Sequence, residues 1–190
     1  LLASVAAQNW LSVLSFLDME PFGALDPVFG YDIGFYVFQL PTLAFVQGIL
    51  TTLIFICSIV VVGSIVVREG LLSGRLHQLS PQATRQILFL GGLLFLSFGA
   101  DWYLERFYTL FTKEGVVWGA GYADVNARIP AYMVMAGISA LVSLACFFGM
   151  KNKNLGMLVS GGVIYIAARL LMTGAWPCLV QDFMVTPNEL

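Results

Sequence analysis

The stretch from Thr42 to Val67 contains no charged residue and is long enough to cross a lipid bilayer as a helix. A hydrocarbon core roughly 30 Å thick needs ~20 apolar residues, and a helix pairs its backbone groups within itself. Three further stretches share this apolar character: 87–104, 130–150 and 155–176. The sequence therefore predicts an all-α fold, a polytopic transmembrane bundle of about four spanning helices.

Local signals indicate where these helices begin. Pro41 and Pro130 precede apolar stretches and suit the first turn of a helix, where an N–H has no partner. Ser80 is a favourable N-cap and Pro81 a favourable first residue for the helix that contains residues 87–104. We therefore expect the prolines to lie at helix starts.

The composition is that of a membrane protein. Hydrophobic residues make up 59% of the chain and charged residues 11%, whereas about a quarter of the residues of a soluble domain are charged. The formal charge of −2 offers no concentrated basic face for a nucleic acid. The expected partners are the lipid bilayer and other membrane protein subunits. We interpret residues 1–190 as a single membrane domain, and as a fragment or the ordered part of a longer chain.

Residues 1–17 have a different pattern. Polar residues recur every three or four positions among apolar ones, at Ser4, Gln8, Ser12 and Ser15. This spacing predicts an amphipathic helix that lies at the membrane interface or lines a helix bundle. The alternative is the end of a further spanning helix.

The charges between the spans predict their orientation. Segments 68–86 and 150–154 fall on one side and carry most of the basic residues: Arg68, Arg75, Arg85, Lys151 and Lys153. The positive-inside rule makes that side cytoplasmic. Residues 105–129 and both chain ends are then expected to face outward.

The segment "GAGYADVNARIP", residues 119–130, is an unusually specific connection between two apolar runs. Its glycines permit tight turns, and Asp124 and Asn126 can bond to nearby backbone N–H groups, which predicts a compact loop. A second interpretation is that the loop holds a partner contact surface at the membrane boundary. That surface would comprise Tyr122, Asp124, Asn126 and Arg128.

A second segment, "DPVFGYDIGFYVFQLP" at residues 26–41, is rich in aromatic residues. Aromatic side chains are favoured at the headgroup level of a bilayer, so an aromatic belt is expected. The alternatives are a groove for a pigment, quinone or lipid tail, and a continuation of the partner contact surface. The residues concerned are Phe29, Tyr31, Phe35 and Tyr36.

Charges within the spans are costly unless they are paired or hydrated. Asp101 and Glu105 share one helical face at a spacing of four, which is unfavourable without a nearby cation. We expect Arg169 or Arg128 to supply that cation in an intramembrane ion pair. The alternatives are separate snorkelling to the interface and an ion or proton pathway.

The residue inventory argues against an enzyme and indicates no cofactor. His77 is the single histidine, and Cys57, Cys146 and Cys178 lack the short paired spacing of a metal or redox site. The acidic residues Asp26, Asp32, Asp124 and Glu105 lack the regular spacing of a calcium loop. No catalytic residue and no metal ligand is therefore predicted.

The two segments quoted above, followed by "TPNEL" at residues 186–190, resemble a known family in order and spacing. The chain is similar over essentially its whole length to uncharacterised protein family 0182, a group of bacterial integral membrane proteins. The resemblance implies about seven spanning helices followed by a large domain outside the cytoplasm, with no established activity. This chain corresponds to the later helices, in the bacterial inner membrane or another energy-transducing membrane.

Three function classes follow. The first is a non-enzymatic membrane anchor or a structural subunit of a larger membrane assembly. The second is a transporter or conduit, lined by Ser4, Gln8, Ser12, Gln47, Thr51, Asp101 and Arg169. The third is an accessory subunit that helps to hold a pigment or quinone in a bioenergetic complex.

Overall fold

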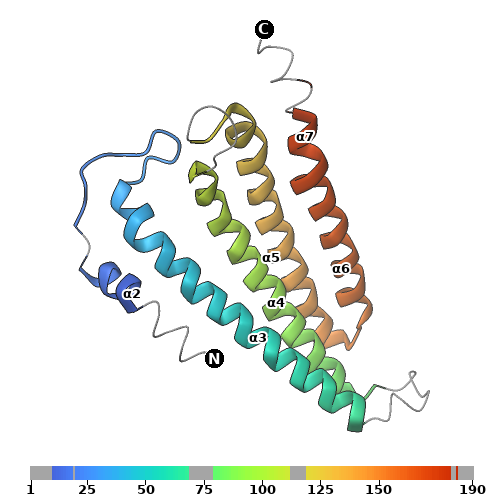
Figure 1. The fold of residues 1–190 in the computed structure, drawn as a ribbon. Helices are drawn as coiled ribbons and strands as arrows, with labels where there is room; N and C mark the ends of the chain where they lie inside the picture. The colour runs from blue at the N-terminus through green and yellow to red at the C-terminus, as the bar shows by residue number, and fades with distance from the viewer. Residues whose placement is uncertain (1–9, 19, 69–78, 112–118, 181–182, 184–190) are drawn as a thin grey trace. The chain divides into compact units, whose positions relative to one another are not determined.

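The computed structural model describes residues 10–18, 20–68, 79–111, 119–180 and 183 (Figure 1). Within these residues the regular secondary structure is helical, apart from one isolated β-bridge between Leu25 and Asp32. The prediction of an all-α protein is confirmed. The chain divides into two compact units, Leu1–Leu50 and Thr51–Leu190, which are described separately.

Four helical stretches are long and apolar enough to cross a membrane, which confirms the predicted polytopic bundle. They are Phe35–Arg68, Pro81–Phe111, Asp124–Asn152 and Gly156–Val180. Their main helices are α3 (Leu40–Arg68), α4 (Pro81–Tyr108), α5 (Ile129–Asn152), α6 (Gly156–Arg169) and α7 (Trp176–Val180). The 3₁₀ turn η3 (Thr109–Phe111) extends α4.

The first unit contains the short helix α2 (Trp10–Leu17), in which no residue is buried. Residues 1–9 of the predicted amphipathic helix lie outside the described residues. The hydroxyl of Thr42, on α3, donates a hydrogen bond of 2.9 Å to the carbonyl of Ser12. This bond ties α2 to the beginning of α3 within the unit.

The described residues include three π-helical turns: η1 (Phe35–Gln39), η4 (Asp124–Arg128) and η5 (Leu170–Ala175). Each is followed, after one intervening residue, by a proline: Pro41, Pro130 or Pro177. A proline has no N–H to donate, and its ring clashes with the carbonyl four residues earlier. That carbonyl lies inside the π-turn in all three cases, and the wider turn accommodates the ring.

Two of these prolines correct the expected helix boundaries. Pro41 and Pro130 are the second residues of α3 and α5 and so lie in the first α-helical turn, as predicted, but a π-turn precedes each helix and the helical stretch begins earlier. Pro81 behaves as predicted, because Ser80 is the N-cap of α4 and its hydroxyl accepts from the backbone N–H of Ala83 at 3.2 Å. A proline directly after a cap needs no wide turn.

In the second unit α4, α5 and α6 pack side by side around small residues (Figure 1). The hydroxyl of Ser143 on α5 donates to the carbonyl of Gly92 on α4 at 2.7 Å, and both residues are buried. A Cβ added at Gly99 would lie 3.3 Å from the carbonyl of Ala136, and one at Gly161 would lie 2.6 Å from Val142. Small side chains thus let the helices approach closely.

The turn between α5 and α6 is short and well defined. Lys153 adopts the left-handed conformation with φ of 50°, and its N–H donates to the carbonyl of Gly149. The carboxamide of Asn154 accepts from the N–H of Gly156 at 2.9 Å, which caps the start of α6. The two helices therefore run antiparallel: α5 begins at η4, and α6 continues into η5 at the other end of this unit.

Candidate functional site

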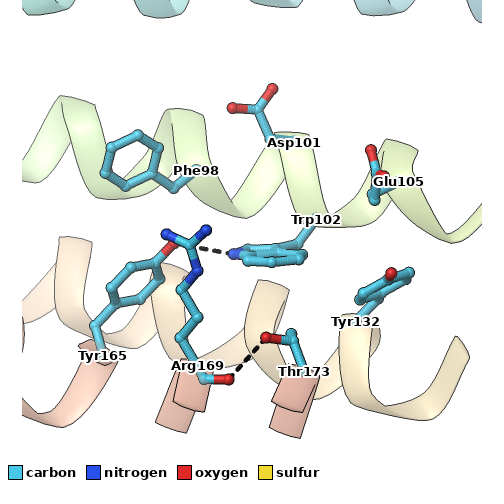
Figure 2. A pocket seen from close by; sticks show the side chains of 8 residues that line it. All are labelled: Phe98, Asp101, Trp102, Glu105, Tyr132, Tyr165, Arg169 and Thr173. Carbon is cyan, nitrogen blue, oxygen red and sulfur yellow. Dashed lines mark hydrogen bonds between the residues drawn. The ribbon is translucent and has the colours of Figure 1, made fainter. Parts of the chain in front are cut away.

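A pocket of about 460 Å³ opens among α4, α5, α6 and η5 in the second unit (Figure 2). Its lining combines four aromatic side chains, two carboxylates, a guanidinium and a hydroxyl. The residues are Phe98, Asp101, Trp102, Glu105, Tyr132, Tyr165, Arg169 and Thr173. This mixture of charge and aromatic surface within membrane-spanning helices makes the pocket the candidate functional site.

Helical spacing gathers these side chains on facing surfaces. The residues from α4 are separated by three, one and three positions, and therefore occupy one face of that helix. Tyr165, Arg169 and Thr173 recur every four positions along α6 and η5. Tyr132 completes the lining from α5. The pocket thus has one stripe of residues from α4, one from α6 and η5, and a single ring from α5.

The aromatic side chains form a connected wall. The indole N–H of Trp102 donates a 3.0 Å hydrogen bond to the hydroxyl of Tyr165 (Figure 2). The rings of Trp102 and Tyr132 stack with centroids 5.4 Å apart, and those of Phe98 and Tyr165 stack at 5.9 Å. These contacts fix Trp102 between α5 and α6, because its polar edge and its face are both occupied.

Arg169 places its charge beside this wall. Its guanidinium carbon lies 5.8 Å from the centroid of the Trp102 ring, within cation–π range. The carboxyl groups of Asp101 and Glu105 point away from the guanidinium (Figure 2). No carboxylate among the described residues forms an ion pair with Arg169. The structure thus brings three of the four predicted ion-pair residues to one pocket, and their pairing stays a prediction.

The fourth residue, Arg128, lies on η4 and pairs with Asp124 one helical turn earlier. The guanidinium nitrogen Nη1 is 3.0 Å from Oδ1 of Asp124, whose side chain is 8% exposed. Oδ2 of the same carboxylate accepts from the N–H of Gly121 at 2.9 Å, as predicted for this aspartate. The pair fixes the turn that leads into α5.

The remaining predicted residues of this segment lie on its outer side. Tyr122 is 61% exposed, and Asn126 is exposed as well. The amide of Asn126 donates to the carbonyl of Tyr122 at 3.0 Å, so the prediction that it would bond to a backbone N–H is wrong. The segment is also helical from Tyr122 onward, where a loop was expected, because the π-turn extends the helix on the N-terminal side of Pro130.

In the first unit, two aspartates order the segment before α3. Asp32 accepts backbone N–H bonds from Gly34, Phe22 and Gly23 at 2.7, 3.0 and 2.9 Å. The bonds from Gly34 and Phe22, with a lesser contribution from Gly23, hold the pKa of Asp32 below its ordinary value and together outweigh the opposing effect of burial. The carboxylate therefore acts as an internal cap for this segment.

Asp26 has a similar role and also contacts the aromatic residues. Its Oδ2 accepts from the N–H of Phe29 at 2.6 Å and from the hydroxyl of Tyr36 at 3.2 Å. Tyr36 is 7% exposed, whereas Tyr31 is 43% exposed and stacks on Phe35 with ring centroids 4.9 Å apart. The predicted aromatic surface thus divides into an inward tyrosine and an outward stacked pair.

A second pocket, of about 410 Å³, lies beside this stacked pair within the first unit. It is lined by Glu20, Pro21, Tyr31, Asp32, Gly34, Phe35 and Gln39. Both carboxylate oxygens of Asp32 already accept backbone N–H bonds. The Asp32 carboxylate at this pocket is therefore engaged in holding the chain.

The other predicted residues are distributed over the chain. Cys57, Cys146 and Cys178 are free thiols, and His77 lies outside the described residues. No group of three metal-ligating side chains occurs in the described part of the chain. Among the conduit residues, Asp101 and Arg169 share the 460 Å³ pocket, and Thr51 bonds to the hydroxyl of Ser97 at 2.6 Å. Ser4 and Gln8 are not among the described residues.

Sequence reasoning missed the aromatic members of the pocket. Phe98, Trp102, Tyr132 and Tyr165 lie within apolar spans, where aromatic residues are ordinary lipid-facing or packing residues. The available signal was the repeat of four from Tyr165 through Arg169 to Thr173, which places a tyrosine and a threonine on the face of the one arginine in that span. That repeat does not reveal which neighbouring helix faces it.

Four long apolar helices, three of which line a mixed polar and aromatic pocket, define an integral membrane protein of the helical-bundle class. The model of the uncharacterised protein family UPF0182 matches residues 1–190, and the chain belongs to this family. The resemblance noted from the three segments is thereby confirmed.

Relatives in several bacteria support this assignment. A UPF0182 protein of Synechococcus is 35% identical over 99% of this chain, which spans 24% of that protein. UPF0182 proteins of Trichlorobacter lovleyi and Corynebacterium efficiens are each 33% identical over 97% of this chain, which spans 21% and 19% of them. The chain thus covers about a fifth to a quarter of the length of these relatives. No solved structure matches it.

Proposed function

We propose that this chain is a non-enzymatic integral membrane module that anchors or structurally supports a larger membrane assembly. The observation that carries the proposal is the η4 turn with the residues just before it. Some side chains of this segment are buried and fix its conformation, and others face outward. Asp124 and Ala127 are buried, at 5% and 0% exposed, while Tyr122 and Asn126 are exposed. A fixed turn that presents a tyrosine loses little conformational entropy when it binds a partner.

Contacts behind the turn support the same proposal. η4 packs against α7, and the Asp124–Arg128 pair holds it from within. A tyrosine at the edge of a membrane span has an apolar body and a polar tip, which suits a protein interface at that depth. Tyr122 is therefore the first residue to test as a partner contact.

The proposal includes an orientation. The basic residues are concentrated in the segments 68–86 and 150–154, and Lys151 and Lys153 lie at the α5–α6 turn. We infer that residues 68–86 and 150–154 are cytoplasmic and that residues 105–129 and both chain ends face outward. In this orientation the Tyr122 surface faces away from the cytoplasm, as does the pocket end of α6.

The test compares Tyr122→Ala with Phe148→Ala in the full-length protein, in its native membrane. Phe148 is a matched control, because it is 58% exposed and lies toward the opposite end of the same helical stretch. After cross-linking and purification, mass spectrometry measures the yield of each co-purifying protein. We expect Tyr122→Ala to lower the yield of a stoichiometric partner about tenfold and Phe148→Ala to leave it unchanged.

Equal yields from the two variants would remove the Tyr122 surface from the proposal. Recovery of the protein without any stoichiometric partner, from membranes cross-linked before solubilisation, would contradict the role in an assembly. The circular dichroism spectrum of each purified variant serves as the folding control. An unchanged spectrum assigns a lost partner to the contact surface.

A further inference from the structure

The 460 Å³ pocket contains charges of both signs that do not neutralise one another. Arg169 is exposed and forms no ion pair with a carboxylate of the described residues. Glu105 is also exposed, and its carboxyl group points away from the guanidinium (Figure 2). The guanidinium and the carboxylate thus lie at separate parts of one pocket, with Trp102 between them in the view of Figure 2.

A ligand with a single charge would be attracted by one of these two groups, the guanidinium or the carboxylate, and repelled by the other. A ligand that carries an anion and a cation a few bonds apart would satisfy both parts. A guanidinium is the preferred side chain for a phosphate, because its fork of donors matches the phosphate oxygens. An ammonium group matches the carboxylate of Glu105, because its N–H donors form charge-assisted hydrogen bonds with carboxylate oxygens.

The surroundings of the pocket identify the rest of the ligand. Arg169 ends α6 within a span, and the apolar residues beside it are open: Ile166 is 59% exposed and Leu170 is 69% exposed. Such a surface next to a charged pocket suits acyl chains that continue from a polar headgroup. The pocket volume lies within the usual range for small-molecule sites, roughly 300–1,000 Å³.

We propose that this pocket binds the headgroup of a zwitterionic phospholipid that carries a primary ammonium group. Arg169 binds the phosphate, and Glu105 accepts hydrogen bonds from the ammonium group beside the rings of Trp102 and Tyr132. Asp101 adds negative potential to the same lining. The acyl chains run along the exposed apolar surface of α6 and η5. This inference is independent of the partner surface at Tyr122.

The test measures lipid binding by native mass spectrometry of the full-length protein in detergent. The probes are phosphatidylethanolamine, phosphatidylcholine and phosphatidylglycerol with identical acyl chains, together with soluble glycerophosphoethanolamine. We expect the ethanolamine lipid to bind best, because the choline group has no N–H to donate and the glycerol group has no positive charge. We expect the soluble headgroup to compete weakly.

The variants separate the two charges. Arg169→Gln is expected to weaken phosphatidylethanolamine binding about tenfold. Its matched control is Arg85→Gln, which changes an exposed arginine of α4 that does not line the pocket, and which should leave binding unchanged. Glu105→Gln is expected to weaken ethanolamine lipid binding and to spare or improve phosphatidylglycerol binding.

Several outcomes would overturn the proposal. Equal binding of the three lipids would show that the headgroup is not recognised, and preferential binding of phosphatidylglycerol would indicate a site for anions alone. If Arg169→Gln and Arg85→Gln changed lipid binding equally, the phosphate would not be bound by Arg169 in this pocket. Effective competition by glycerophosphoethanolamine would indicate a soluble ligand. Arg169→Lys keeps the charge and should retain part of the binding, which distinguishes lost recognition from lost folding.

Discussion

Single carboxylates determine the backbone conformation at the ends of the helices. Asp32 and Asp26 accept N–H bonds that no helix or strand satisfies, and Asp124 does the same for Gly121. Aspartate suits this role because its short side chain reaches backbone groups two or three residues away. The sequence predicted the bond made by Asp124, since it needs only local geometry. It did not predict the bond of Asp32 to Phe22, which joins residues ten positions apart.

The lowered pKa of Asp32 predicts acid sensitivity of the segment before α3. A lowered pKa in the folded state means that the carboxylate is stabilised by folding, so its contribution is complete above the ordinary value of 3.8. That contribution is lost as the pH falls through the lower pKa of the folded segment. The amide resonances of Gly23 and Gly34, in glycine-labelled protein, should therefore shift with a midpoint below 3.8.

The Asp32→Asn variant is the control for this titration. Its carboxamide cannot ionise, so the same glycine resonances should lose this titration. Amide exchange in the segment should become faster, because a neutral acceptor forms weaker hydrogen bonds than a carboxylate. A midpoint above 3.8 in the unmodified protein would contradict the cap that we assign to Asp32.

At the level of helices, the contacts among α4, α5 and α6 depend on small residues placed where the backbones come closest. Ser139, Ser143 and Gly161 lie at these contacts, and all three are buried. The sequence did not predict the π-turns, because a proline after a polar segment has the same local signature as a helix start. The distinction depends on whether the preceding residues are already helical.

The α4–α5 contact can be tested with two glycines that have different surroundings. A Cβ at Gly99 would lie 3.3 Å from both the Ala136 carbonyl and the Ser139 Cβ, whereas a Cβ at Gly137 would have no neighbour within 4 Å. We expect Gly99→Leu to lower the free energy of unfolding by about 1–3 kcal/mol through overpacking. Gly137→Leu should leave it nearly unchanged. Equilibrium unfolding in mixed detergent micelles measures the free energy of unfolding of both variants.

Comparable stability of the two leucine variants would show that α4 and α5 tolerate separation at Gly99. A large loss of stability for Gly137→Leu alone would place the critical contact on another face of α5. Gly99→Ala is an intermediate variant, because a single methyl group at 3.3 Å needs only a small shift of its neighbours. Its stability should fall between those of the unmodified protein and Gly99→Leu.

At the level of the whole molecule, the number and type of spans could be predicted from hydropathy alone. A bilayer imposes a length and forbids unpaired backbone, which makes spans recognisable from sequence. The pocket could not be predicted in the same way. Its stripe on α4 follows from spacing, but the meeting of Trp102, Tyr132 and Tyr165 depends on how three helices pack, which is set by contacts far apart in the chain.

The proposed orientation predicts that a reagent outside the cell reaches one end of the α5 stretch and not the other. Tyr122→Cys and Lys153→Cys are introduced singly into full-length protein whose native cysteines are replaced. A membrane-impermeant maleimide added to intact cells should label position 122 and spare position 153, because the basic turn is retained in the cytoplasm. Lysed cells should show labelling at both positions. The reverse pattern in intact cells would invert the proposed orientation.

The three π-turns have a consequence for changes in chain length. A π-turn corresponds to an α-helix with one inserted residue, accommodated locally as a bulge. Deletion of one residue within Leu170–Ala175 would return that stretch to α-helical geometry and keep α6 and α7 facing their present neighbours. The same deletion within Gly156–Arg169 would rotate everything beyond it by about 100°. The prolines therefore lie next to the positions where these helices can lose a residue without turning their faces away from the bundle.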